Sequence, residues 1–514
     1  MTFTAPDIDY AGLSPVLALT AGLCVVLLSG VFGRRHRRVV ASGLSLATLA
    51  AAAGLVIWQW GEREDLVAGA LRLDELGLAV SLICIAAAAF VIPLAWREPA
   101  FDPDAGPGGQ AEFQALTLSS VLGMVLLAQA QNLIVLFVAL ELLSVPLYVL
   151  CGAARRRAES LESGLKYLIV GSLGSATLLY GLAFIYGGAG STDFGVIAQE
   201  IGSGLADDPL ILVGVALSAT GLAFKLSVAP FHQWTPDVYQ GAPTPVTAFM
   251  AVATKAAAFA VLVRFFEIAL GSAAGDWRPA LAALAAISIV VGNAGALGQD
   301  SLKRLLGYSG VAQAGYMLVG VVAFSEAGVN ALVFYLAAYA LMNLAAFAVI
   351  TLRERQTPHG DDIRSVAGLT REGPVLAAAL TISMLALAGL PGTAGFIGKL
   401  FLIEAAVEAD YTWLGVAIAI GTMISLAYYL RVVAAIWMRP AEETAAGAPT
   451  GAPAAALAGG SQEADAAAVP GARCRAIVAL AALAAAATVF FGVLPSPLVD
   501  WASQAGAALA DAFR

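Results

Sequence analysis

The lysines are the residues of this sequence whose placement suggests chemistry. Of the 27 lysine and arginine residues, only five are lysines: Lys166, Lys225, Lys255, Lys303 and Lys399. Four of them lie inside long apolar stretches, and the loops carry arginine almost throughout. Arginine stays protonated under nearly all conditions, whereas a lysine withdrawn from water can lose its proton near neutral pH. This distribution indicates a relay of protons through buried lysines.

Snorkelling to the membrane surface is the alternative explanation for such lysines, and depth separates the two interpretations. Lys255 lies nine residues after Val246 and nine before Arg264, which is about 14 Å along a helix in each direction. A lysine side chain cannot easily reach water from there, so Lys255 is predicted to be functional. Lys166 lies near the start of its stretch and could snorkel. Lys303, beside an arginine, could be no more than a marker of the inner surface.

Two of the lysines lie close to signals for a broken helix. Lys225 precedes Pro230, and Lys399 follows the turn Gly389–Gly392, which contains a proline. Proline interrupts a helix, and irregular backbone inside a membrane occurs where it lines a cavity or is buried in protein. Both lysines are therefore predicted to be functional.

Two other titratable residues are candidates for the same relay. Glu141 is the one acid in the apolar stretch 132–152, and a lysine on another helix would keep its carboxylate charged. The alternative is an ion pair that only fixes packing. His232 stands between a proline and Asp237, and could pass protons between the interior and water. A histidine that merely caps a loop is the alternative. Separately, Arg264 and Glu267, three residues apart, are placed to pair with each other.

The elements that must position these residues are membrane-spanning helices. The chain has 514 residues, 60% of them hydrophobic and 12% charged, and its mean hydropathy is +0.84. A soluble domain has about 25% charged residues, and stretches of about 20 apolar residues are long enough to span a bilayer. The four cysteines show no metal or iron–sulfur spacing and are predicted to be apolar fillers. Fourteen spans are predicted near 13–32, 40–59, 75–95, 112–129, 132–152, 161–187, 209–230, 244–269, 279–298, 302–324, 328–352, 374–407, 411–438 and 473–494.

Basic residues in the loops predict the orientation of these spans. With the N-terminus outside, 17 of the 27 lysines and arginines fall in inner loops, 4 fall outside and 6 lie within spans. The positive-inside rule therefore places both termini on the outer side. The stretch Ala441–Ala472, rich in alanine, glycine and proline, is predicted to be a flexible inner loop. The segment Thr192–Ile201 is predicted to lie along the outer surface.

Four motifs together resemble the proton-translocating antiporter-like subunits of respiratory complex I, the NADH:quinone oxidoreductase. They are Leu140–Pro146, the run Phe224–Phe259, Asp300–Tyr316 and Leu390–Lys399. The form PDVYQGAPTPVTAF within the second run resembles the N-type subunit, the counterpart of mitochondrial subunit 2. The resemblance extends from about residue 110 to about residue 435.

The resemblance implies an all-α polytopic membrane fold of about 14 helices, with two inverted five-helix repeats that each contain one broken helix. The implied organisation is an N-terminal segment, a first repeat, a second repeat, an inner loop and a final helix, over residues 1–110, 111–270, 271–438, 439–472 and 473–514.

The resemblance also implies how protons would move. The implied site consists of Glu141 and Lys225 as a pair in the inlet half, Lys166 tuning that pair, Lys255 as the central relay, Lys399 as the outlet-side lysine and His232 on the cytoplasmic connection. Quinone reduction elsewhere in the complex would open or close the inlet pair and drive a proton from one lysine to the next.

The same resemblance implies a subunit of an enzyme rather than an enzyme by itself. The chain would hold no cofactor, and the complex would use NADH, FMN, iron–sulfur clusters and quinone. Its neighbours would be the M-, K- and J-type membrane-arm subunits in a bacterial inner membrane, without nucleic acid. The alternatives are a subunit of a multisubunit cation/proton antiporter, a membrane-bound hydrogenase subunit, or a structural scaffold with inert ion pairs.

Overall fold

The computed structural model describes residues 8–31, 37–96, 98, 109–206, 208–440 and 475–509. Thirteen of its helices are long and apolar enough to cross a membrane. The remaining predicted crossing, the twelfth (374–407), is formed by two shorter helices that follow one another, Pro374–Ala388 and Ala394–Glu408. The predicted all-α membrane fold is therefore confirmed. The predicted loop Ala441–Ala472 lies outside the described residues.

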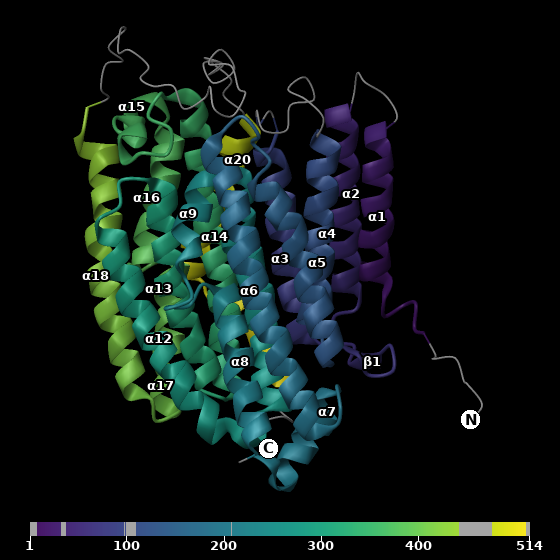
Figure 1. Cartoon of the computed structure of the whole chain (residues 1–514). Coiled ribbons are helices and arrows are strands. Elements are labelled where there is room, and N and C mark those ends of the chain that lie inside the picture. The colour runs from purple at the N-terminus through teal and green to yellow at the C-terminus, as the bar shows by residue number, and fades with distance from the viewer. Residues whose placement is uncertain are drawn as a thin grey trace.

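The first two crossings lie at one edge of the bundle, at the right of Figure 1, and the third lies further inside it. A short antiparallel hairpin joins the second and third of them, with Glu64 opposite Leu73. Asp74 follows the hairpin and caps the third helix by accepting a hydrogen bond from Gly77 N (2.8 Å). The elements are α1 (Ser14–Val31), α2 (Arg37–Trp58), β1 (Glu64–Leu66), β2 (Leu71–Leu73) and α3 (Glu75–Leu94).

The next group of elements contains the first broken helix. The predicted span over 209–230 is shorter than expected, because α8 ends at Leu226 and Ser227 takes a left-handed conformation (φ 62°). The chain passes Pro230 before it becomes helical again. The elements are α4 (Gln110–Ala128), α5 (Leu133–Cys151), α6 (Ala158–Ala189), α7 (Phe194–Glu200), η3 (Ile201–Leu205), α8 (Pro209–Leu226), α9 (Trp234–Gly241), α10 (Thr244–Phe249), η4 (Met250–Thr254), α11 (Lys255–Val263) and η5 (Arg264–Ala269).

The following group contains the second broken helix, at the predicted position. Gly389 and Gly392 take positive φ angles of 79° and 85°, which glycine adopts without the steric cost of a side chain. The elements are η6 (Gly271–Ala273), α12 (Ala274–Leu297), α13 (Leu302–Val322), α14 (Glu326–Gln356), η7 (Ile363–Val366), α15 (Leu369–Glu372), α16 (Pro374–Ala388), α17 (Ala394–Glu408) and α18 (Thr412–Met438), followed by α20 (Arg475–Val493) and α21 (Ser496–Ala507).

The two broken helices run in opposite directions. In Figure 1, α8 lies in the lower half of the bundle with α9 above it, whereas α16 lies in the upper half with α17 below. This arrangement is the one expected of inverted repeats. The repeat boundaries 111–270 and 271–438 stay predictions.

The centre of the bundle is formed by two helical segments that are almost entirely withdrawn from the surface. Every residue from Thr244 to Glu267 is buried, and so is every residue of α13 except Arg304 and Tyr308. The large exposed apolar side chains lie instead on peripheral helices such as α1, α6 and α18, where they would face lipid. The buried charged groups on these segments are therefore withdrawn from the membrane surface.

Candidate functional site

The lysines divide into four buried residues and one exposed residue. Lys225, Lys255, Lys303 and Lys399 are 4%, 1%, 0% and 3% exposed. The side chain of Lys166 is 40% exposed. The depth argument from the sequence thus identified Lys255 correctly as a residue that does not snorkel. The same holds for Lys225 and Lys399 beside the helix breaks.

Lys255 binds the end of the first broken helix. Its Nζ donates to Leu226 O (3.0 Å), the last carbonyl of α8, and to Gly310 O (2.9 Å) on α13. The last four carbonyls of a helix lack partners within the helix and carry partial negative charge. The broken end of α8 therefore supplies a neutral acceptor for an amine at mid-membrane depth.

Lys399 repeats this arrangement at the second broken helix. Its Nζ donates to Leu387 O (2.9 Å), next to the last residue of α16, and lies 5.0 Å from the centre of the Tyr316 ring. Among the described residues, no carboxylate lies within ion-pair distance of Lys255 or Lys399. Both amines are thus held by backbone dipoles, and Lys399 also by an aromatic face, rather than by an opposite charge.

Lys225 and Glu141 are both present in the interior, but the predicted direct contact between them is not made. Lys225 Nζ donates to Ser144 Oγ (2.8 Å) and Tyr167 OH (3.2 Å). Glu141 lies three residues before Ser144 on α5 and instead accepts a hydrogen bond from Ser175 Oγ. Both groups contact α6, Lys225 through Tyr167 and Glu141 through Ser175. The action of Glu141 and Lys225 as a pair stays a prediction.

Lys166 contacts two acids that do not belong to the inlet pair. It pairs with Glu162 (2.6 Å) and with Asp237 on α9 (2.7 Å), and Asp237 also pairs with Arg304 (2.5 Å). Partial burial alone would raise the pKa of Asp237, but hydrogen bonds from the two basic groups outweigh it and hold that pKa below its ordinary value. Lys166 is thus part of a partly exposed cluster that fastens α9. A direct influence on Glu141 or Lys225 stays a prediction.

His232 lies in the segment between α8 and α9, as predicted, and is half-buried. Its Nδ1 has no hydrogen-bond partner among the described residues, and its ring lies 6.2 Å from that of Tyr308. Asp237, which the sequence suggested as a partner, is occupied by the basic cluster. The structure places His232 at the break, and its part in a proton path stays a prediction.

The predicted pair between Arg264 and Glu267 is wrong. Arg264 is fully buried, pairs with Asp74 and donates from Nε to Ala128 O (2.6 Å). Neither carboxylate oxygen of Glu267 has a hydrogen-bond partner in the described part of the chain. The reason lies in the π-helical segment η5, which begins at Arg264. A wider turn no longer brings residues three apart onto one face.

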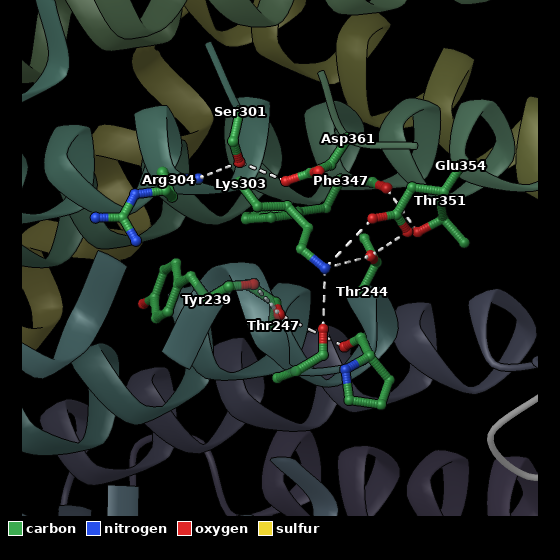
Figure 2. A network of polar contacts seen from close by, with 12 residues as sticks. Tyr239, Thr244, Thr247, Ser301, Lys303, Arg304, Phe347, Thr351, Glu354 and Asp361 are labelled. Atoms are coloured by element: carbon green, nitrogen blue, oxygen red, sulfur yellow. Dashed lines mark hydrogen bonds and ion pairs between the residues drawn. The ribbon is translucent and has the colours of Figure 1, made fainter. Parts of the chain in front are cut away.

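Lys303, for which the sequence left open a mere marker of the inner surface, is fully buried. Figure 2 shows its side chain directed toward Thr244 and Glu354. The Nζ donates to Ala242 O (2.9 Å) and Thr244 Oγ1 (3.2 Å), and lies 3.3 Å from Glu354 Oε1. Glu354 was overlooked because it stands between two arginines and looks like part of a solvated run of charge.

A family model described as NADH:quinone oxidoreductase/Mrp antiporter, transmembrane, matches residues 130–425. This chain belongs to that family. Relatives named NADH-quinone oxidoreductase subunit N include those of Parafrankia sp. (38% identity, covering 98% of this chain and 96% of the relative) and Rhodococcus opacus (38%, 98% and 97%). Another is that of Herpetosiphon aurantiacus (39%, 86% and 90%). The resemblance to the N-type subunits is thereby confirmed.

Solved structures agree with this family. A chain of respiratory complex I from Thermus thermophilus with bound aureothin is 33% identical, with a TM-score of 0.75 over 95% of this chain and 98% of that one. A chain of the Mrp complex from Dietzia sp. is 23% identical, with a TM-score of 0.77 over 98% and 97%. The second likeness shows the fold alone.

The site described here contains titratable groups and no arrangement for binding a metal. Within the described ranges, no group of three or more histidine, cysteine or acidic residues could hold a metal ion. Cys84 and Cys151 are buried and Cys24 is exposed, whereas Cys474 lies outside the described residues. What the arrangement can do chemically is to bind and release protons at buried amines.

Proposed function

We propose that this chain carries protons through the membrane arm of a respiratory NADH:quinone oxidoreductase. The observation that carries the proposal is that Lys255 and Lys399 sit at the two helix breaks, buried and held by backbone carbonyls without a carboxylate partner. The enzyme in this proposal is taken from the relatives, which are named NADH-quinone oxidoreductase subunit N. The redox steps with NADH, FMN, iron–sulfur clusters and quinone belong to other subunits.

The proposed path connects neighbouring contacts. Lys225 is followed by Leu226, whose carbonyl binds Lys255, so the end of α8 carries one lysine and binds the amine of the other. Lys255 also binds Gly310 O on α13, one turn before Gln313. Gln313 Nε2 donates to Leu387 O (3.2 Å), the same carbonyl that Lys399 binds. This continuity supports a route from Lys225 through Lys255 to Lys399.

Small rearrangements of these contacts suffice to drive transport. Moving one charge against 100 mV costs about 2.3 kcal/mol. A hydrogen bond to a charged group contributes about 1.5–3 kcal/mol. A shift of α8 that strengthens or breaks one bond to Lys225 or Lys255 is therefore comparable with the work required. Glu141 acts in this proposal through the charge it adds near Lys225, across the Ser144 and Ser175 hydroxyls.

The proposed setting is a bacterial inner membrane, with M-, K- and J-type subunits as neighbours. Both termini lie on the outer side in this proposal, which rests on the positive-inside distribution of 17 basic residues against 4. The alternatives of a cation/proton antiporter or a hydrogenase subunit are less well supported, because the curated relatives are named subunit N. Proton transport that requires sodium would favour the antiporter.

The test uses the intact complex in proteoliposomes, with NADH oxidation and proton uptake followed together. Lys225→Met is expected to lower the protons moved per NADH. Thr220→Ala on the same helix is the control, since its hydroxyl only donates to Ala216 O (2.9 Å) within α8. An unchanged proton-to-electron ratio in Lys225→Met would remove Lys225 from the path, and the same result in Lys255→Met would remove the central relay.

A further inference from the structure

The surroundings of Lys303 share the construction of the two lysines at the breaks. Lys303 is fully buried and donates to Ala242 O, the C-terminal cap of α9. Lys255 binds the end of α8 in the same way, and Lys399 binds the end of α16. Three buried amines thus each hold the carbonyl end of a half-helix, although the proposed path uses only two of them.

Other buried cations of this chain that hold the fold through ion pairs are arginines, whereas residue 303 is a lysine. Arg264 is fully buried and pairs with Asp74. Arg353, which is 4% exposed, donates to Ser365 O (2.6 Å) and pairs with Glu372 (2.7 Å). Arginine serves a permanent ion pair better, because its charge is fixed and its donors are preorganised. Lysine at this buried position differs from arginine because its amine can release a proton, whereas a guanidinium does not.

The partner of Lys303 reaches toward the surface. The side chain of Glu354 is 19% exposed, whereas that of Lys303 is wholly buried. Thr244 stands between them, because its hydroxyl donates to Glu354 and its oxygen accepts from Lys303 Nζ (Figure 2). The three groups form a chain from a partly exposed carboxylate to a buried amine.

We propose that Lys303 is a further proton-carrying lysine, loaded from the inner surface through Glu354 and Thr244. In this step the Glu354 carboxylate takes a proton from water. The Thr244 hydroxyl then accepts that proton from the acid and passes its own to the neutral Lys303 amine. The result is an ammonium at Lys303, a restored carboxylate at Glu354 and one proton moved from the inner surface to the buried amine. No electron or other reactant takes part.

The loaded proton lies close to the central relay. Lys303 and Gly310 are seven residues apart on α13, hence on one face and about 10 Å apart, and Gly310 O binds Lys255. Thr244 begins the continuous helical run that leads to Lys255. The inference rests on the proposed function and adds to it a second inlet, separate from Glu141.

The decisive variant is Lys303→Arg, studied in the reconstituted intact complex. Arginine keeps the charge and can pair with Glu354, but it does not release its proton. Loading through this inlet should slow about 10²-fold, the low end of what a positioned proton-transfer group contributes, so fewer protons should be taken up per NADH. The number of protons taken up per NADH should fall similarly in Lys303→Met. Arg353→Lys, next to Glu354 but outside the chain of three groups, is the matched control and should transport like the unaltered protein.

Other outcomes would decide against the inference. If Lys303→Arg transports normally while Lys303→Met does not, the position needs only a positive charge. Should Lys303→Arg fail to assemble, Glu354→Gln decides, because it keeps the shape but cannot be loaded; normal transport by that variant overturns the proposal. Lys255→Met, measured in the same assay, distinguishes failure of the second inlet from failure of the proposed proton transport. Loss in Lys255→Met with normal Lys303→Arg refutes the second inlet alone, and normal transport in both refutes the proposed function as well.

Discussion

Replacing Lys255 by methionine removes the amine at the centre of the bundle while keeping most of its volume. The side chain is 1% exposed, and its Nζ contacts are Leu226 O and Gly310 O, at 3.0 and 2.9 Å. Methionine is unbranched and flexible, so it can fill the same space. Two carbonyls lose a donor, which costs about 1–3 kcal/mol for each buried group left unsatisfied. Removal of a buried amine offsets part of this cost, so assembly of the complex should survive.

The effect on transport should be much larger than the effect on assembly. Without an amine at residue 255, a proton would have to cross this part of the path as an unsupported charge. The effective penalty for a buried ion is several kcal/mol. With a penalty of about 4 kcal/mol and about 1.4 kcal/mol for each tenfold change in rate, proton transfer through this chain should slow about 10³-fold.

The assay is NADH-driven acidification of vesicles that contain the intact complex, normalised to the amount of complex assembled. Lys255→Arg is the informative companion, because it keeps a cation and its donors but cannot act as a relay. Both variants should lose transport to a similar extent. Full transport by Lys255→Met would refute the reasoning, and recovery in Lys255→Arg alone would show that the position needs a charge rather than a transferable proton.

Two further predictions concern the packing that positions the site. In Gly492→Ala, the new methyl group would lie 2.3 Å from Thr393 Cα at the second break, so the variant should lose about 1–3 kcal/mol through overpacking; a lower thermal midpoint of the purified complex would show this. Gly187→Ala, with no atom within 4 Å of the added carbon, is the control and should leave the midpoint unchanged or raise it. Asp74→Asn would leave Arg264 without its buried partner, and breaking such a pair costs about 3–5 kcal/mol. We expect less assembled complex, measured by native gel, with normal transport per assembled complex; a normal yield would contradict this estimate.

Local signals in the sequence were sufficient to predict the membrane spans and the helix breaks. Long apolar runs are a property of the chain itself, and a proline between two glycines at 389–392 cannot continue a straight helix. The depth of Lys255 also follows from counting residues along one helix. Each of these inferences depends on a single segment, and the structure confirms each of them.

Contacts between segments could not be predicted in the same way. Lys303 and Arg304 are adjacent in sequence, but successive residues on a helix point about 100° apart. Arg304 therefore meets Asp237 at the partly exposed side, while Lys303 turns to the interior, where α14 brings Glu354. The orientation of Glu141 toward Ser175, rather than toward Lys225, likewise depends on how α6 packs.

The partners of the buried amines explain why the helices must be broken. A carboxylate beside an amine stabilises its charged form strongly and holds the proton in place. Backbone carbonyls at a helix end attract an ammonium ion more weakly, so the same site can also hold a neutral amine. Such carbonyls are free at membrane depth only where a helix stops there. The breaks at α8 and α16 create these acceptors for Lys255 and Lys399. Acids belong instead near the inlets, with Glu141 close to Lys225 and Glu354 beside Lys303, where a proton must be captured before it is passed on.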